Sequence, residues 1–243
     1  MEIAVDIFLL AILGSFVLRT VGFGFGIFIM TVLPFLMPSY GEATALSGLL
    51  AMTTSVFIAF RMRKYLNWHH LWPILLTFVI LSTISIFLLK RMDDVLLRRI
   101  LGVVLILTAL YFAFFSERIK LKTNLPTQVG AGVISGLLGG FFGMQGPPAV
   151  LYFLSSEPDK EHYMAMIQTY LLMGNIVMAI VRAHNGFITS TVGWDYLYGV
   201  GGVAIGYGIG SLVFRHIPQR VFKYVVYGYI GVSGIVVLFT AGL

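Results

Sequence analysis

Gly22-Phe23-Gly24-Phe25-Gly26 and Gly143-Met144-Gln145-Gly146-Pro147-Pro148 are two glycine-rich stretches that interrupt long apolar runs. The first lies within the apolar segment 3–37, and the second lies within the apolar segment 127–155. Each segment is too long for one membrane span of about 20 residues and too short for two spans. We therefore expect each segment to form a broken helix or a re-entrant helical hairpin that turns at its glycines.

The composition around these stretches is that of a membrane protein. The 243 residues are 58% hydrophobic and only 11% charged, whereas a soluble domain has about 25% charged residues. This excludes a soluble globular protein and a disordered chain, and the long unbroken apolar runs exclude a transmembrane barrel. We expect an all-α integral membrane protein that crosses the cell membrane several times, in a bacterium the cytoplasmic membrane.

The same pattern occurs twice along the chain. A shift of 121 residues places Gly22 on Gly143, and each glycine-rich segment is followed by three further apolar runs of helix length. Segment 116–126, which is charged and ends in leucine and proline, is the expected linker. We therefore expect two repeats, each a hairpin followed by three transmembrane helices, with the bounds 1–121 (hairpin 3–37) and 122–243 (hairpin 127–155).

Lysine and arginine in the connecting segments orient these repeats. If each hairpin returns to the side from which it started, four segments with ten basic residues share one side, and two segments with five share the other. If each hairpin instead crosses once, the split is seven against eight. The first arrangement has the stronger bias. It places both termini outside and the linker inside, and it makes the two repeats inverted relative to each other.

The glycine-rich stretches are also the candidate binding site. Unwound backbone inside a membrane persists only where it is buried in protein or lines a cavity, and paired broken helices point to a transporter site. Half-helix N-termini offer N–H donors that suit an anion; the alternative is a packing hinge without a ligand. The candidate substrate-binding residues are Gly22, Phe23, Gly24, Phe25, Gly26, Gly143, Met144, Gln145, Gly146 and Pro147.

Polar residues on the following helices form a candidate second layer. Ser47 and Thr54 share a helix face, and the shift of 121 residues places them on Gln168 and Asn175. Their hydroxyl and amide groups can donate to an oxyanion, or they can form hydrogen bonds between helices. Arg19, just before the first glycine-rich stretch, is a candidate for neutralising an anion or for reaching the membrane interface.

Other polar residues are expected to have structural roles. Arg61 and Arg182 correspond between the halves and are expected to anchor helix ends at the interface. All ten carboxylates lie at or near segment ends, which argues against a buried acidic proton relay. The spacings Gly132-Gly136-Gly140 and Gly202-Gly206-Gly210 are typical of helix packing.

Several kinds of chemistry find no support in the sequence. There is no cysteine, and no histidine pair has helical metal-ligand spacing, so we expect no metal site and no cofactor. No nucleophile and base are paired as in an enzyme active site, so no catalytic residue is proposed. The basic residues lie in short connecting segments, as in a membrane protein, and do not indicate binding to nucleic acid.

The arrangement resembles the TauE/SafE family of sulfite and organosulfonate exporters. The resemblance rests on the first glycine-rich stretch, followed by an apolar arm ending near Pro34, and on the sequence from Gly136 to Pro148. The chain departs from the family pattern at Phe25 and Gln145, where glycine is common. The resemblance implies a secondary transporter of small sulfur-containing or other organic anions, with a proton as a candidate coupling ion.

We therefore expect an inverted-repeat transporter that moves a small anion across the membrane by alternating access. The alternatives are an anion channel, which would need a continuous wetted pore, and a structural membrane subunit without transport activity. The expected partners are the small anion, a coupling proton and the lipid bilayer. The sequence leaves the oligomeric state and the direction of transport open.

Overall fold

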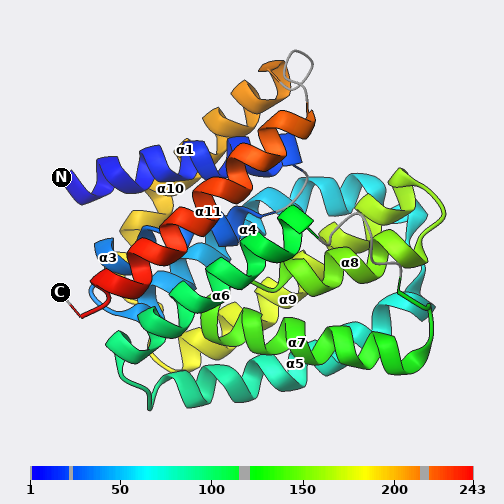
Figure 1. Cartoon of the computed structure of the whole chain (residues 1–243), viewed down its shortest axis with the longest axis horizontal. Helices are drawn as coiled ribbons and strands as arrows, with labels where there is room; N and C mark the ends of the chain where they lie inside the picture. Colours follow the sequence, from blue (N-terminus) through cyan, green and yellow to red (C-terminus); the bar gives the residue numbers. More distant parts are fainter. Residues whose placement is uncertain (1, 22–23, 115–120, 214–218, 243) are drawn as a thin grey trace.

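The computed structural model describes the backbone of residues 2–21, 24–114, 121–213 and 219–242, where all regular structure is helical. The elements are α1 (Glu2–Val21), α2 (Phe25–Ile29), α3 (Leu33–Leu36), α4 (Tyr40–Met62), η1 (Arg63–Tyr65), α5 (Trp68–Leu89), α6 (Asp94–Phe114), α7 (Leu125–Phe142), α8 (Gly146–Ser156), α9 (Lys160–His184), α10 (Ser190–Val213) and α11 (Gln219–Thr240). Among the described residues, five helices are long and apolar enough to cross a membrane. The prediction of an all-α membrane protein is thus confirmed, and Figure 1 shows both chain ends at one end of the molecule.

Polar residues mark where four of the long helices begin. Their side chains accept a hydrogen bond from a backbone N–H in the first turn, which no residue within the helix can pair. These N-caps are Ser39 for α4, Asn67 for α5, Asn124 for α7 and Asp159 for α9. The short polar connectors between the apolar runs therefore also define the helix starts.

The second arm of the first hairpin differs from the prediction. The apolar run 25–37 forms two short helices, α2 and α3, separated by a turn, rather than one arm. Pro34 lies in the first turn of α3, where its missing N–H leaves no partner unpaired. A continuous helix would require Pro34 to donate to the carbonyl of Met30, which proline cannot do, so the arm breaks before it.

The second hairpin has two continuous arms, α7 and α8. Gly143 ends α7 with φ 67°, a left-handed conformation that glycine adopts without steric cost. Leu121, just before α7, donates its N–H to Ser155 Oγ near the end of α8 at 3.1 Å. The chain therefore leaves this hairpin at the end of the molecule where it entered.

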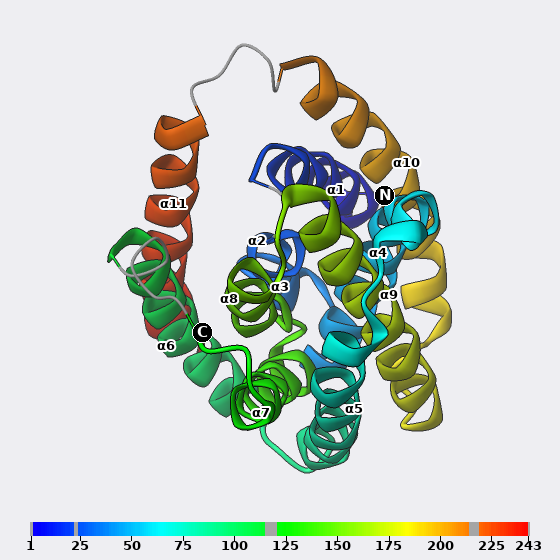
Figure 2. The same cartoon turned by 90° about the vertical axis from the view of Figure 1, so that its right-hand side faces the viewer.

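Helices from the two halves pack in pairs. The closest pairs are α1 with α10, α5 with α7, α4 with α9 and α6 with α11, and Figure 2 shows α5 beside α7 and α6 beside α11. The two halves can be matched in order, α1 with α7, α4 with α9, α5 with α10 and α6 with α11. If each helix is replaced by its match in the other half, the pair α1–α10 becomes α7–α5. The pairs α4–α9 and α6–α11 stay the same.

The glycine spacings noted in the sequence lie at two of these pairs. A Cβ on Gly132 of α7 would lie 2.7 Å from the carbonyl oxygen of Ile74 on α5. A Cβ on Gly206 of α10 would lie even closer to the carbonyl oxygen of Ile12 on α1. Larger residues would separate the helices, so the prediction that these glycines serve packing is confirmed.

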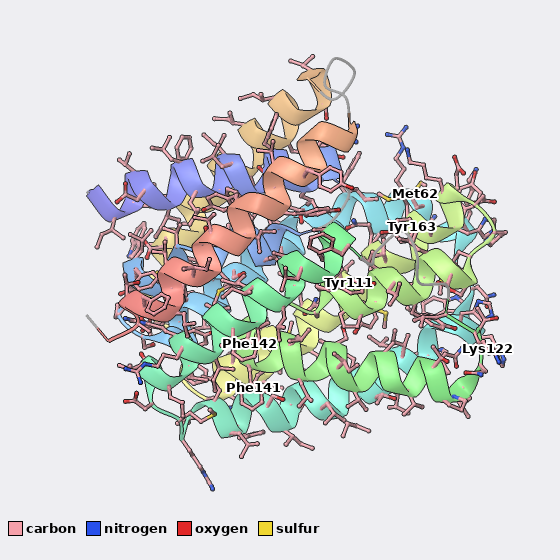
Figure 3. The ribbon with its side chains drawn as sticks, viewed as in Figure 1. Met62, Tyr111, Lys122, Phe141, Phe142 and Tyr163 are labelled. Atoms are coloured by element: carbon pink, nitrogen blue, oxygen red, sulfur yellow. The ribbon has the colours of Figure 1, made fainter. Side chains whose placement is uncertain are left out.

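The segments 61–70, 121–124 and 155–163 gather at one end, which we call the connector end. The Tyr65 and His162 rings are in edge contact with centroids 5.3 Å apart, and His70 Nδ1 lies 3.0 Å from Glu157 Oε1. Figure 3 labels Met62, Lys122 and Tyr163 at this end. Asp159 is exposed here, and its pKa is lowered, mainly because the backbone N–H of His162 donates to its carboxylate.

The segments 37–42, 90–99 and 184–195 gather at the opposite end, together with both chain termini, and we call this the terminal end (Figure 1). The N–H of Tyr40 donates to Asp94 Oδ2 at 2.9 Å, which joins the start of α4 to the start of α6. Phe187 packs directly on Gly41. Two opposite ends separated by long helices are the geometry expected of a protein that spans a bilayer.

Candidate functional site

The two glycine-rich segments meet inside the molecule. A Cβ built on Gly26, in the first turn of α2, would lie only 2.5 Å from the carbonyl oxygen of Gly143. Side chains do not approach a backbone oxygen this closely, so the contact requires glycine at position 26. Ser47 of α4 flanks it, because its Oγ lies 3.7 Å from that Cβ position and 3.6 Å from the one on Gly143. The contact joins the first repeat to the second.

A small cavity of about 40 Å³ opens beside this contact, and we call it the central cavity. Four of its lining residues have polar side chains, and none is charged. It has room for a few waters or for a solute of a few heavy atoms, unlike the cavities of about 300 Å³ or more that hold drug-sized ligands. Its lining is Leu18, Gly24, Phe25, Gly26, Ile27, Ala51, Thr54, Ser55, Gly143, Met144, Gln145, Gly146, Leu171 and Asn175.

Backbone from both segments borders the central cavity. The first-turn N–H groups of a helix have no acceptor within that helix. Phe25, Gly26 and Ile27 form the first turn of α2 and line the cavity, as does Gly146 at the start of α8. The two residues that follow Gly146 are prolines and have no N–H. The first segment therefore brings more backbone donors to the cavity than the second.

Gln145 is held in the second segment by hydrogen bonds to α7 and α9. Its carbonyl oxygen accepts from the hydroxyl of Ser135 on α7, and that hydroxyl accepts in turn from Tyr170 of α9 at 2.7 Å. Its side-chain Nε2 donates to the carbonyl oxygen of Leu171 at 3.3 Å. Its Oε1 is buried and has no hydrogen-bond partner among the described residues. The amide is thus fixed through its backbone and its nitrogen, beside the cavity.

Two glycines make room for this arrangement. A Cβ on Gly139 would lie 2.9 Å from Cβ of Gln145, and one on Gly174 would lie 3.5 Å from its Nε2. The ring of Phe78 fills the remaining space, since it lies 2.8 Å from both of these Cβ positions. Phe78 is itself in edge contact with Tyr170, with ring centroids 5.3 Å apart. The second segment is therefore closely packed on the side away from the cavity.

Arg182 does not anchor a helix end at the interface, so this prediction was wrong. Its side chain is 1% exposed, and its Nη2 donates to the carbonyl oxygens of Gly139 at 3.0 Å and Gly140 at 3.3 Å. Both carbonyls belong to the last turn of α7, where helical partners run out; that of Gly139 also accepts from the N–H of Gly143 at 3.0 Å. A cation there also offsets the negative partial charge of the helix C-terminus. Arg182 therefore stabilises the end of the arm that leads to Gly143.

The structure brings most of the candidate binding residues together. Those that line the central cavity are Gly24, Phe25, Gly26, Gly143, Met144, Gln145, Gly146, Thr54 and Asn175. Gly22 and Phe23 lie outside the described residues. Ser47 is buried behind the contact of the two segments, and its Oγ has no partner among the described residues. Pro147 faces a separate apolar groove between α6, α7 and α8.

Arg19 and Gln168 also lie away from the central cavity. They line a second cavity of about 280 Å³ at the connector end, which we call the arginine cavity. Leu18 borders both cavities, so the two are neighbours. The layer formed by Ser47 and Gln168 is therefore split: Ser47 lies at the central contact, and Gln168 lies toward the connector end.

Two carboxylates lie at segment ends, as predicted, but are buried. Glu42 in the first turn of α4 is 9% exposed, and Asp195 near the start of α10 is 7% exposed. One oxygen of each has no hydrogen-bond partner among the described residues. Their position near the end of an apolar run did not predict that they are buried. The loop that contains Phe187 packs on Gly41, next to Glu42, at the terminal end.

The supporting residues around Gln145 were not identified from the sequence. Ser135, Tyr170 and Phe78 lie on three different helices, and nothing in their local sequence distinguishes them from ordinary packing residues. Arg182 did carry a signal, because it lies seven residues after Asn175 and so shares its helix face. A charged residue on the face that carries a candidate binding residue is a functional candidate in a membrane helix.

Comparisons with known proteins extend the resemblance noted in the sequence. The family model described as "Sulfite exporter TauE/SafE" matches residues 7–237. The chain is 25% identical over 212 residues to a probable membrane transporter protein of Methanocaldococcus jannaschii, an alignment that covers 82% of this chain and 75% of that protein. No solved structure matches the chain.

Proposed function

Since this chain belongs to the sulfite exporter TauE/SafE family of membrane transporters, we propose that it is a secondary transporter of a small anion. The class of solute is sulfite, a sulfonate or a related organic anion, and the mechanism is alternating access across the cytoplasmic membrane. The observation that carries the proposal is the central cavity, because interrupted segments from both halves of the chain line it. Unwound backbone in a membrane protein is expected where it lines such a space.

The lining of the cavity fits a small anion better than a cation. It has no carboxylate, which a cation would favour, and it offers hydroxyl and amide groups from Thr54, Ser55, Gln145 and Asn175. First-turn N–H groups of α2 add donors. Because none of the described residues that line the cavity is a lysine or arginine, the anion would be held by neutral donors and released without breaking an ion pair.

The exchange pattern of helix pairs supports two inverted repeats. The pairs α1–α10 and α7–α5 replace each other when the halves are exchanged, and the pairs α4–α9 and α6–α11 are unchanged. Two similar units related by a two-fold axis in the membrane plane would have this property. In this proposal both hairpins are re-entrant, the connector end is cytoplasmic, and rocking of one half against the other exposes the cavity alternately.

The test is transport by the purified protein in liposomes. Labelled sulfite or methanesulfonate should enter in a saturable manner, and unlabelled substrate inside should accelerate uptake by counterflow. Uptake without saturation or counterflow would indicate a channel instead, and no uptake of any small anion would reject the proposal.

A matched pair of variants tests whether the central cavity is the site. A Cβ on Gly146 or on Gly130 would meet no atom within 4 Å, so both positions accept a side chain. Gly146→Leu would fill the central cavity and should abolish uptake. Gly130→Leu, on α7 away from the cavity, should transport like the unchanged protein. Equal transport by both variants would remove the central cavity as the site.

We also propose a proton as the coupling ion, with Glu42 and Asp195 as the groups that carry it. Both are buried with an unpartnered oxygen, whereas Asp159 is exposed. Uptake driven by a pH gradient should be lost in Glu42→Gln and Asp195→Asn but retained in Asp159→Asn. Counterflow, which needs no net proton movement, should persist in all three. A gradient that does not alter uptake by the unchanged protein would reject proton coupling.

A further inference from the structure

The arginine cavity has a lining that differs from that of the central cavity. With about 280 Å³ it is the larger of the two, and it lies at the connector end between α1, α4, α9 and α10. Its lining is Leu18, Arg19, Phe57, Ile58, Arg61, Met62, Met164, Gln168 and Tyr207. Two of these residues are cationic and none is acidic, so the cavity has a positive potential in which an anion is concentrated.

The two arginines approach the cavity from different helices. Arg19 lies in the last turn of α1. Its Nε donates to Ser211 Oγ at 2.9 Å, and its guanidinium lies 5.4 Å from the centroid of the Tyr207 ring. These contacts hold the charge against the wall formed by α10. Arg61, in the last turn of α4, is exposed. The cavity therefore has one positioned cation and one that reaches toward the water.

Gln168 adds a buried polar group to this lining. Its residue is 1% exposed, and its Oε1 has no hydrogen-bond partner among the described residues. A buried amide oxygen left unpaired costs free energy, and an amide can also donate two hydrogen bonds through its nitrogen. A water that donates to Oε1 would pair this oxygen and can also donate to an anion in the cavity.

The arginine cavity adjoins the central cavity along two walls. Leu18 borders both cavities directly. A further cavity of about 240 Å³ lies between α4 and α10; it shares Thr54 with the central cavity and Phe57, Ile58 and Tyr207 with the arginine cavity. The three spaces form a series from the connector end to the contact of the two interrupted segments.

We infer that the arginine cavity is a separate anion-binding vestibule through which the solute reaches the central cavity from the connector end. Arg19 and Arg61 attract the anion from water, and Gln168 takes over part of its hydration. The central cavity then receives it with neutral donors alone. This inference rests on the proposed function for the identity of the anion as the transported solute.

An anionic lipid headgroup has the same chemistry as a free anion, and we assign the vestibule to the free solute. The reason is that it adjoins the central cavity, which a headgroup tethered to acyl chains has no need to approach. The experiment therefore compares nanodiscs of zwitterionic lipid with nanodiscs that contain anionic lipid.

The chain has no cysteine, so a single introduced cysteine is the only thiol that a reagent can label. Met164→Cys places a thiol in the lining of the vestibule. Its reaction rates with an anionic and a cationic methanethiosulfonate reagent are measured and divided by those of a small free thiol. In zwitterionic nanodiscs the anionic reagent should be favoured by roughly five-fold or more, as expected from one or two nearby charges in a partly hydrated space.

Removal of the charges should remove this preference. Arg19→Gln and Arg61→Gln, each in the Met164→Cys background, should lower it several-fold, whereas Arg61→Lys should retain it. Arg63→Gln is the matched control, since Arg63 lies in η1 outside the vestibule, and it should leave the ratio unchanged. Added sulfate or methanesulfonate should slow labelling by the anionic reagent.

Two results would overturn the inference. One is a ratio of anionic to cationic labelling equal to that of the free thiol. The other is labelling by the anionic reagent that anionic lipid slows and soluble anion does not. Labelling does not depend on transport. A failed labelling result would leave the proposed transport function intact, while failed uptake with positive labelling would reject the transport function and keep the anion site.

Discussion

The two interrupted segments reach the central cavity by different means. The second, at Gly143 and Gln145, is held from behind by hydrogen bonds from Ser135 and Arg182. In the described part of the first, Gly24 has φ 96° and no side-chain cap, and α2 approaches its neighbour through the bare backbone of Gly26. The second segment thus supplies a positioned amide, and the first supplies close-packed backbone with N–H donors.

The two segments should therefore respond to different kinds of substitution. Residues that support the second segment lie behind it, so their loss should first lower stability. The first segment contributes through the absence of side chains, so adding atoms there should first impair the cavity. The four predictions below test this contrast, from the largest expected effect to the smallest.

Arg182→Ala should cause the largest loss of stability. It removes two hydrogen bonds donated by a buried cation, one to Gly140 and one to Gly139, whose carbonyl keeps the N–H of Gly143 as a second donor. Hydrogen bonds to charged groups contribute about 1.5–3 kcal/mol each. We expect the free energy of unfolding in detergent to fall by about 2–5 kcal/mol. Arg61→Ala, its counterpart in the first half, is the matched control; it is exposed and should change stability by less than about 0.5 kcal/mol. Equal losses in both would contradict the role of Arg182.

Gly26→Ala should separate the two segments. The added Cβ would lie 2.5 Å from the carbonyl oxygen of Gly143, and overpacking of this kind costs about 1–3 kcal/mol. Transport in liposomes should be lost, because the cavity lining shifts. Gly146→Ala makes the same chemical change where no atom lies within 4 Å, and it should retain stability and most transport. Normal transport by Gly26→Ala would show that the contact of the segments is dispensable.

Ser135→Ala should have a moderate effect. It removes the hydroxyl that joins Gln145 to Tyr170, at a cost of about 1–3 kcal/mol for the buried groups left unpaired. Ser85→Ala is the control, because its hydroxyl bonds only the Leu81 carbonyl of its own helix and should cost less. Thermal unfolding of the two variants in the same detergent gives the comparison, and a Ser85 variant that is as destabilised would refute it.

The smallest effect is expected at the polar pair Thr54 and Asn175. The Thr54 hydroxyl already donates to the Ala51 carbonyl at 2.6 Å, so Thr54→Val should raise the KM for transport by less than about three-fold. Asn175→Leu should raise it by about ten-fold, the loss expected for a hydrogen bond to a charged solute. A larger effect of Thr54→Val would mean that the threonine, not the asparagine, holds the anion.

Much of this arrangement was predictable from local sequence. The glycine-rich stretches predicted both interruptions, and the shift of 121 residues paired Thr54 with Asn175, which line one cavity. Such features depend on neighbours in the chain, through glycine conformation and proline geometry.

Other features could not be predicted because they depend on which helices become neighbours. Arg182 is near the end of its own helix, and it is buried because α7 ends beside it. Arg19 and Gln168 looked like partners of the glycine-rich stretches, but the packing of α1 against α4, α9 and α10 places them in a separate cavity.

By itself, the sequence determined that this chain is a helical membrane protein with two interruptions of its helices. Both follow from short-range physics: the free energy of transferring apolar runs from water, and the backbone freedom of clustered glycines together with the missing N–H of proline. Only the tertiary structure decided that the interruptions touch, which polar groups face the space between them, and which arginine is buried. Those outcomes depend on contacts between residues 42 or more positions apart, for which the local pattern carries no information.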